Sequence, residues 1–148
     1  MSESISVIIP SALRQAPDGE LWLVKALRSV AAQTLPPTEV IIGLDPGECW
    51  INVSSGPDGQ LNTAVGNGRI KGHQAACNAA VQASASPLIC FLEDDDIYES
   101  KHLQYLYEAM QRHKVDFVSM SQQQVDFDDK DLCVFDFPTC SGWLLRRK

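Results

Sequence analysis

The sequence predicts an α/β fold in which a mainly parallel sheet is covered by helices on both faces. Three observations lead to this prediction. Near-continuous apolar runs occur at residues 5–9, 39–44 and 88–92, as in strands of buried parallel sheets. Segments whose apolar residues recur at helical spacing lie between these runs. The order strand, helix, strand within residues 5–44 is that of a right-handed βαβ unit.

Length and composition indicate one domain, which we assign to residues 1–148, with 45% hydrophobic and 21% charged residues. No apolar run approaches the ~20 residues that a transmembrane helix needs. The N-terminal residues 1–4 lack the basic region of a secretory signal, so we expect a cytoplasmic protein. The net charge of −7 argues against a partner role with nucleic acid or an anionic membrane, although a bound cation could still attract a polyanion. The five cysteines include no Cys-x-x-Cys pair, which predicts buried free thiols rather than a zinc site.

The first part of the chain reads as two strands with a helix between them. Residues 5–9 form a β-branched strand that ends at a proline. Asp18 is the expected N-cap of the helix, which ends before the proline pair at residues 36–37. The second strand spans residues 39–44. A long loop rich in Gly, Pro, Asn, Asp and Ser follows, with one short strand expected near residues 61–65.

The second part continues the alternation. Small apolar residues recur through residues 73–84 and predict a helix packed closely on the sheet. Residues 88–92 form the next buried strand. A further helix is expected to begin at a Ser100 cap and to bury one apolar face. The remaining strands are expected at residues 116–120, in a hairpin of 125–127 with 132–137, and within 139–145.

Four consecutive carboxylates, Glu93 to Asp96, follow the strand at residues 88–92. Ligands of α/β folds bind at the carboxyl ends of the strands, and Ser11 and Asp45 would share that edge. Side chains two apart on a strand share a face, so Glu93 and Asp95 are expected to converge. A hard divalent cation would neutralise such a pair. The alternative is a solvated loop that caps the following helix, but the position at the end of a buried strand favours the cation site.

A series of motifs extends along residues 5–106 in a characteristic order. Its members are residues 5–10, 27–30 with 33–34, 39–45, Gly72 with 76–78, and 91–96. This series resembles family 2 glycosyltransferases of the GT-A fold. The resemblance implies a Rossmann-like, mainly parallel sheet and a hexosyltransferase-type enzyme. It also implies a nucleotide-diphosphate-sugar donor, with a UDP-sugar favoured, and Mn²⁺ or Mg²⁺ as the cofactor.

The resemblance also implies roles for individual residues. The residues expected to bind the nucleotide sugar are Pro10, Ser11, Asp45, Gly72, Asn78 and Asp94. Of these, Asp45 matches the family's acidic residue that hydrogen-bonds the base. Residues 93–95 match the family's D-x-D triplet, with Asp95 the leading metal ligand and Glu93 and Asp96 beside it. In this mechanism the cation stabilises charge on the departing diphosphate while an acceptor hydroxyl attacks the anomeric carbon.

The chain departs from the family pattern at several positions. Glu93 replaces an aspartate, and Cys77 stands where an arginine is common. The residues that could supply the missing positive charge are Arg69, Lys71 and His73. Residues 139–147 resemble the strand that precedes the family's acidic base motif, so we expect the acceptor half and the base to be absent from this sequence. Asp136 is a late alternative for a base, and no residue is assigned as catalytic.

Three functions remain open at this point. The first is a small glycosyltransferase that borrows its acceptor site from a homodimer partner or another chain. The second is a non-catalytic module that binds nucleotide sugars. The third is a nucleotidyltransferase-like enzyme, although the sequence near residue 11 lacks a Gly-rich phosphate loop and offers Arg14 as the nearby cation. Trp143 and an exposed strand edge favour self-association, and a core tryptophan is the equal alternative.

Overall fold

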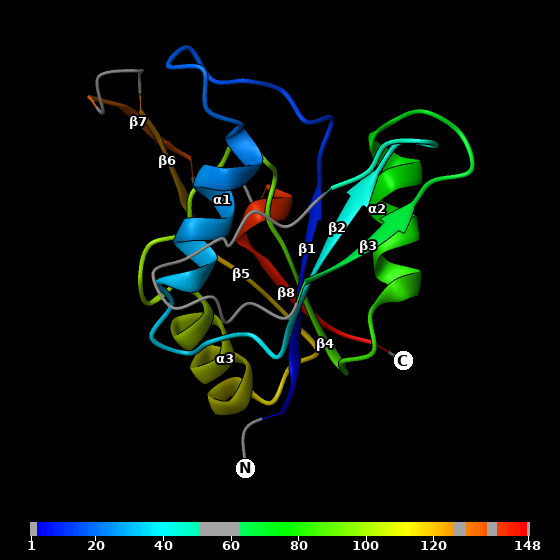
Figure 1. The fold of residues 1–148 in the computed structure, drawn as a ribbon. Coiled ribbons are helices and arrows are strands. Elements are labelled where there is room, and N and C mark those ends of the chain that lie inside the picture. Colours follow the sequence, from blue (N-terminus) through cyan, green and yellow to red (C-terminus); the bar gives the residue numbers. More distant parts are fainter. Residues whose placement is uncertain (1–2, 51–62, 126–129, 136–138, 148) are drawn as a thin grey trace.

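The computed structural model describes residues 3–50, 63–125, 130–135 and 139–147. Within these residues a central six-stranded sheet has the order β3-β2-β1-β4-β8-β5 (Figure 1). Its strands are β1 (Ile5–Pro10), β2 (Glu39–Leu44), β3 (Thr63–Asn67), β4 (Leu88–Phe91), β5 (Phe117–Ser119) and β8 (Trp143–Arg146). Strands β3, β2, β1 and β4 are parallel, and β8 runs antiparallel to both of its neighbours. The predicted mainly parallel α/β sheet is confirmed.

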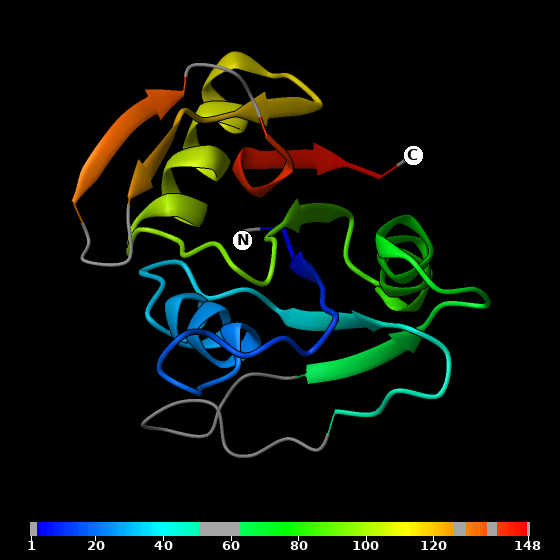
Figure 2. The same cartoon turned by 90° about the horizontal axis from the view of Figure 1, so that it is seen from above.

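Helices cover both faces of this sheet (Figures 1 and 2). Helices α1 (Trp22–Ala31) and α3 (His102–His113) bury apolar side chains in one core cluster with β1, β2 and β4. Helix α2 (His73–Ala83) packs on the opposite face, where Ala80 joins Ile8, Ile41 and Ile89. Alternate residues of β1 therefore face different cores, as expected for a strand buried on both sides. None of the described helices is long and apolar enough to cross a membrane.

The small residues of α2 bring its backbone unusually close to the sheet. A Cβ atom added to Gly43 would lie 2.2 Å from the carbonyl oxygen of Ala76, and one on Gly66 would lie 2.6 Å from that of Ala79. Glycine on the strands and alanine on the helix leave just enough room for this contact. The close packing, which the sequence predicted, fixes the N-terminal end of α2 beside the carboxyl end of β2.

Both predicted helix caps are wrong. Helix α1 has Leu21 at its N-cap, because residues 15–21 first fold into a small loop closed by an antiparallel bridge between Gln15 and Leu21. Asp18 sits in that loop, where it accepts a hydrogen bond from the Glu20 amide at 3.1 Å. Helix α3 has Lys101 at its N-cap rather than Ser100. The Ser100 carbonyl instead accepts a hydrogen bond from the Thr34 amide at 2.8 Å.

The later strands lie near their predicted positions, but the first hairpin strand spans residues 122–125 and shares only Val125 with the predicted 125–127. Strands β6 (Gln122–Val125) and β7 (Asp131–Phe135) pair as an antiparallel hairpin that projects from the body (Figure 1). The predicted strand residues 126–127 and 136–137, which include Asp136, lie outside the described part. A 3₁₀ turn, η1 (Cys140–Gly142), precedes β8 and replaces the start of the last predicted strand.

All five cysteines are free thiols, as predicted, but burial was predicted too broadly. Cys90 is buried, Cys49 and Cys133 are exposed, and Cys77 and Cys140 are partly exposed. Cys49 lies in the loop after β2 and Cys133 lies on the hairpin strand β7, and neither cysteine packs in the core.

Candidate functional site

The predicted site residues lie where parallel strands end. Ser11 follows β1, Asp45 follows β2, and Glu93 to Asp96 follow β4. The Asp96 amide donates to the Glu93 carbonyl at 3.1 Å, so residues 93–96 form a turn, which we call the acidic turn. The strand alternation that predicted convergence of Glu93 and Asp95 does not apply, because β4 ends at Phe91. The two carboxylates have different partners: Glu93 contacts His73 and Cys140, and Asp95 contacts Arg14.

Asp94 is the buried member of the acidic turn, with its side chain 5% exposed. It accepts hydrogen bonds from Ser11 Oγ at 2.7 Å and from Arg14 Nη2 at 3.1 Å. The hydrogen bond and charge of Asp94, and then the charge of Asp95, raise the pKa of the Arg14 guanidinium. Asp94 thereby ties the loop after β1 to the turn after β4. The sequence placed Asp94 at the nucleotide, and the structure gives it this anchoring contact.

Asp95 lies at the rim, with its side chain 47% exposed and its Oδ2 atom 3.2 Å from the same Arg14 nitrogen. Asp96 lies deeper and accepts a hydrogen bond from Ser141 Oγ at 2.5 Å. Burial raises the pKa of Asp96; the Ser141 hydrogen bond opposes this, and the charges of the neighbouring carboxylates add to it. Ser141 also accepts a hydrogen bond from the Glu93 amide at 2.9 Å, so η1 braces the acidic turn from behind.

Glu93 faces a cavity of about 360 Å³ between α2 and the start of β8. Its carboxylate lies 2.8 Å from His73 Nε2 and accepts a hydrogen bond from Cys140 Sγ at 2.6 Å. The residues that line the cavity are His73, Gln74, Cys77, Asn78, Phe91, Glu93, Cys140 and Trp143. Asn78 therefore lines the same cavity as Glu93. Burial and the Glu93 carboxylate raise the pKa of Cys140 to about 12, so this thiol stays protonated at neutral pH.

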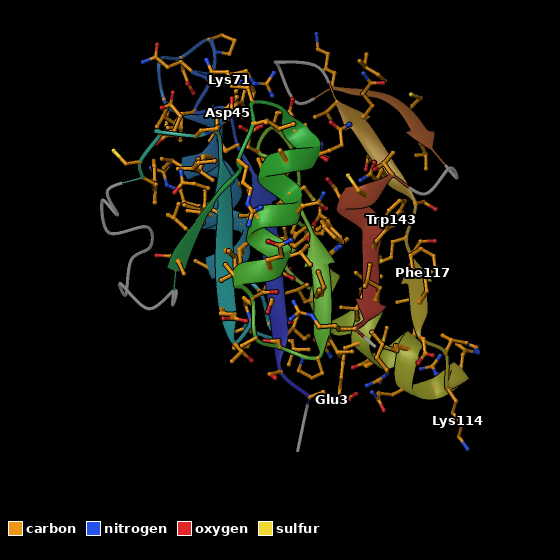
Figure 3. The ribbon with its side chains drawn as sticks, turned by 90° about the vertical axis from the view of Figure 1, so that its right-hand side faces the viewer. Glu3, Asp45, Lys71, Lys114, Phe117 and Trp143 are labelled. Atoms are coloured by element: carbon orange, nitrogen blue, oxygen red, sulfur yellow. The ribbon has the colours of Figure 1, made fainter. Side chains whose placement is uncertain are left out.

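Asp45 and Gly72 meet directly, since the Gly72 amide donates to Asp45 Oδ1 at 2.8 Å. Figure 3 shows Asp45 and Lys71 together at one end of the molecule, with Glu3 and Lys114 at the other. The contact joins the end of β2 to the N-terminal end of α2. A left-handed backbone at Gly72, with φ of +129°, makes this approach possible.

The described residues alone do not supply enough ligands to hold a metal ion. Among the described residues, no group of three or more His, Cys, Asp or Glu side chains is arranged to hold one. Cations that serve phosphate transfer commonly take one or two protein carboxylates, and phosphate oxygens and water complete the shell. The exposed Asp95 carboxylate, already paired with a positive group, fits such a partial site. The residues therefore fit a cation whose coordination shell is completed by the oxygens of a bound diphosphate.

Sequence reasoning missed three contacts of this site. Arg14 was noted as a nearby cation, and its place just after β1 could have indicated contact with the acidic turn. Ser141 and Cys140 come from η1, more than forty residues further along the chain than the acidic turn they contact. A second depression of about 570 Å³ lies between α1 and the segment before α3, and its lining includes none of the predicted site residues.

Three comparisons with known proteins bear on this site. Residues 6–132 match the family model "Glycosyl transferase family 2". "Uncharacterized glycosyltransferase YwdF" from Bacillus subtilis (strain 168) is 34% identical over 110 residues, which is 74% of this chain and 40% of the relative. The chain thus spans less than half of that curated relative.

Solved structures show the fold. S. aureus TarS 1-349 in complex with UDP-GlcNAc matches 84% of this chain and 36% of its own, with a TM-score of 0.64 and 21% identity. The 4-diphosphocytidyl-2C-methyl-D-erythritolsynthase from Anaerococcus prevotii matches 97% of this chain and 71% of its own, with a TM-score of 0.59 and 16% identity. The sheet and its helices are those of the GT-A fold that the sequence predicted. The chain belongs to glycosyl transferase family 2.

Proposed function

We propose that this chain forms the donor site of a glycosyltransferase that uses a UDP-sugar and Mn²⁺ or Mg²⁺. The observation that carries the proposal is the acidic turn at the carboxyl end of β4, anchored to the loop after β1 through Asp94. The relative YwdF carries the name of a glycosyltransferase, and the structural neighbour TarS is described with UDP-GlcNAc bound. The free thiols fit a cytoplasmic protein.

Each predicted site residue at the carboxyl ends of the parallel strands has a role in this proposal. Pro10 and Ser11 border the nucleotide, and Asp45 accepts hydrogen bonds from the base. Gly72 and Asn78 line the cleft on the side of α2. Asp95 holds the cation, with Glu93 and Asp96 adding negative charge beside it.

The charge balance explains why a cation is needed. Four carboxylates in a row repel a diphosphate, and the Arg14 guanidinium is already paired with two of them. Cys77 supplies no positive charge at the N-terminal half of α2. A bound divalent cation would supply Lewis-acid stabilisation of the leaving diphosphate. The protein's part is to fix the carboxylates, since Ser11, Arg14 and Ser141 hold the acidic turn in place before the donor arrives.

A second candidate is donor binding without transfer. One observation favours it: every carboxylate of the acidic turn already has a hydrogen-bond partner in the protein, and the most exposed of them, Asp95, is the one assigned to the cation. Under the first candidate, by contrast, a partner chain, including a second copy of this one, would bring the acceptor and the base.

Calorimetric titration of UDP and UDP-GlcNAc, with Mn²⁺ and with EDTA, tests the proposal. We expect Mn²⁺-dependent binding that Asp95→Asn weakens at least tenfold. Asp116→Asn is the matched control, because Asp116 is an exposed carboxylate paired with Arg146. Arg146 also binds Glu3, which lies at the opposite end of the molecule from Asp45 (Figure 3). Binding that is unaffected by both EDTA and Asp95→Asn would contradict the proposal. Release of free sugar without transfer to added acceptors would favour the second candidate.

A further inference from the structure

Arg14 bridges two carboxylates that have very different surroundings. A single nitrogen, Nη2, lies 3.1 Å from Asp94 Oδ1 and 3.2 Å from Asp95 Oδ2. The Asp94 side chain is 5% exposed, whereas those of Arg14 and Asp95 are 58% and 47% exposed. The guanidinium is therefore anchored on its buried side and open to solvent on its rim side.

The two ion pairs should differ in strength. Breaking a buried pair leaves an uncompensated charge in a poorly solvated place, which is strongly unfavourable. An exposed pair gains little, because water and salt screen it. Arg14 thus stays with Asp94 and can release Asp95 at small cost. Ser11 supports this arrangement, because its hydroxyl donates to the other Asp94 oxygen at 2.7 Å.

We propose that Arg14 is the resident counter-ion of Asp95, which a divalent cation must displace, so that Arg14 lowers the cation affinity of the site. This inference rests on the proposed function, because it takes Asp95 as the metal ligand. Arg14 keeps the carboxylates of the acidic turn from repelling one another while the site holds no donor. It also makes the bare protein a weak binder of cations, so that a cation binds well when a diphosphate brings further oxygen ligands.

Removal of Arg14 should raise the cation affinity of the site. Loss of an arginine that merely shaped the site would weaken cation binding. Loss of a competing positive charge beside Asp95 strengthens it, and we expect an affinity for Mn²⁺ alone about tenfold higher in Arg14→Gln. Arg14→Lys keeps the charge and should stay within about threefold of the original protein.

Electron paramagnetic resonance of free Mn²⁺ measures this affinity directly, without donor or activity. Arg28→Gln is the matched control, because Arg28 is 59% exposed and paired with Glu20 at 2.7 Å on α1. It removes the same net charge, so we expect less than a twofold change. Equal or weaker Mn²⁺ binding in Arg14→Gln would overturn the inference.

A second comparison covers the case in which Arg14→Gln fails to fold with Asp94 unpaired. Asp94→Asn and the double variant Arg14→Gln/Asp94→Asn bury no unpaired carboxylate at this position. The double variant should bind Mn²⁺ about tenfold more tightly than Asp94→Asn, and equal affinity would overturn the inference. Asp95→Asn distinguishes failure of the proposed function from failure of the proposal about Arg14. If it leaves Mn²⁺ binding intact, the proposed function fails; if it abolishes binding while Arg14→Gln changes nothing, this inference alone fails.

Discussion

Replacing His102 by phenylalanine is expected to flatten the pH dependence of stability between about pH 6.5 and 4. His102 is the first residue of α3, and its ring stacks on Tyr98 with centroids 4.0 Å apart. Among the described residues its buried Nε2 atom has no hydrogen-bond partner. Burial lowers the pKa of His102 from 6.5 to about 4, against the opposing effect of a hydrogen bond with the Ser141 backbone.

Proton linkage gives the sign and the size of the change in unfolding free energy with pH. Between the two pKa values the unfolded chain binds the proton and the folded chain does not, so stability falls as pH falls. His102 imposes no penalty on the unfolding free energy above pH 6.5. The penalty grows as the pH falls toward 4 and stays constant below that value. Because one pKa unit corresponds to about 1.4 kcal/mol, the total is roughly 3 kcal/mol.

Urea denaturation followed by tryptophan fluorescence measures this effect. The difference in unfolding free energy between the original protein and His102→Phe should shift by most of that amount between pH 7.5 and 4.5. Phenylalanine keeps the stacking on Tyr98, and its other effects are independent of pH. His113→Phe, at the exposed end of the same helix, is the control for removing an imidazole. Parallel curves for the original protein and His102→Phe would refute the reasoning.

Two further substitutions test the packing that builds the site. Ser11→Ala removes a 2.7 Å hydrogen bond to the buried Asp94 carboxylate and should lower the unfolding free energy by about 1.5–3 kcal/mol, measured by urea denaturation; a loss below about 0.5 kcal/mol would show that Asp94 does not depend on Ser11. Gly43→Ala places a Cβ atom 2.2 Å from the Ala76 carbonyl oxygen, so α2 must move away from the sheet. We expect a loss of about 1–3 kcal/mol by thermal unfolding, and an unchanged midpoint would contradict the close approach.

The parallel strands β1, β2 and β4 were predictable because each is buried on both faces, whereas β3 is a largely exposed edge strand. A strand buried on both faces needs apolar residues throughout, so the runs at residues 5–9, 39–44 and 88–92 stand out in the sequence. The packing of α2 was predictable for a related reason. Alanines at positions 76, 79 and 80 meet glycines at 43 and 66, and both sets are visible as small residues.

The sequence predictions failed where contacts between distant residues override the local preference of a residue type. Asp18 is a good cap by residue type, but the bridge between Gln15 and Leu21 places it in a loop before the helix. Glu93 and Asp95 have separate partners, because the chain turns at residues 93–96 and strand alternation no longer applies there. Nothing near Asp96 in the sequence points to Ser141, which lies 45 residues away and braces the acidic turn.

The central claim is that Asp95 holds a cation which in turn binds the donor diphosphate. A crystal structure of the chain with UDP and Mn²⁺, with the metal located by its anomalous scattering, tests it most directly. The account predicts a peak within about 2.0–2.3 Å of an Asp95 carboxylate oxygen and of diphosphate oxygens, with Arg14 still paired to Asp94. UDP bound at this edge with no metal beside Asp95, or with Arg14 still bridging Asp94 and Asp95, would contradict it.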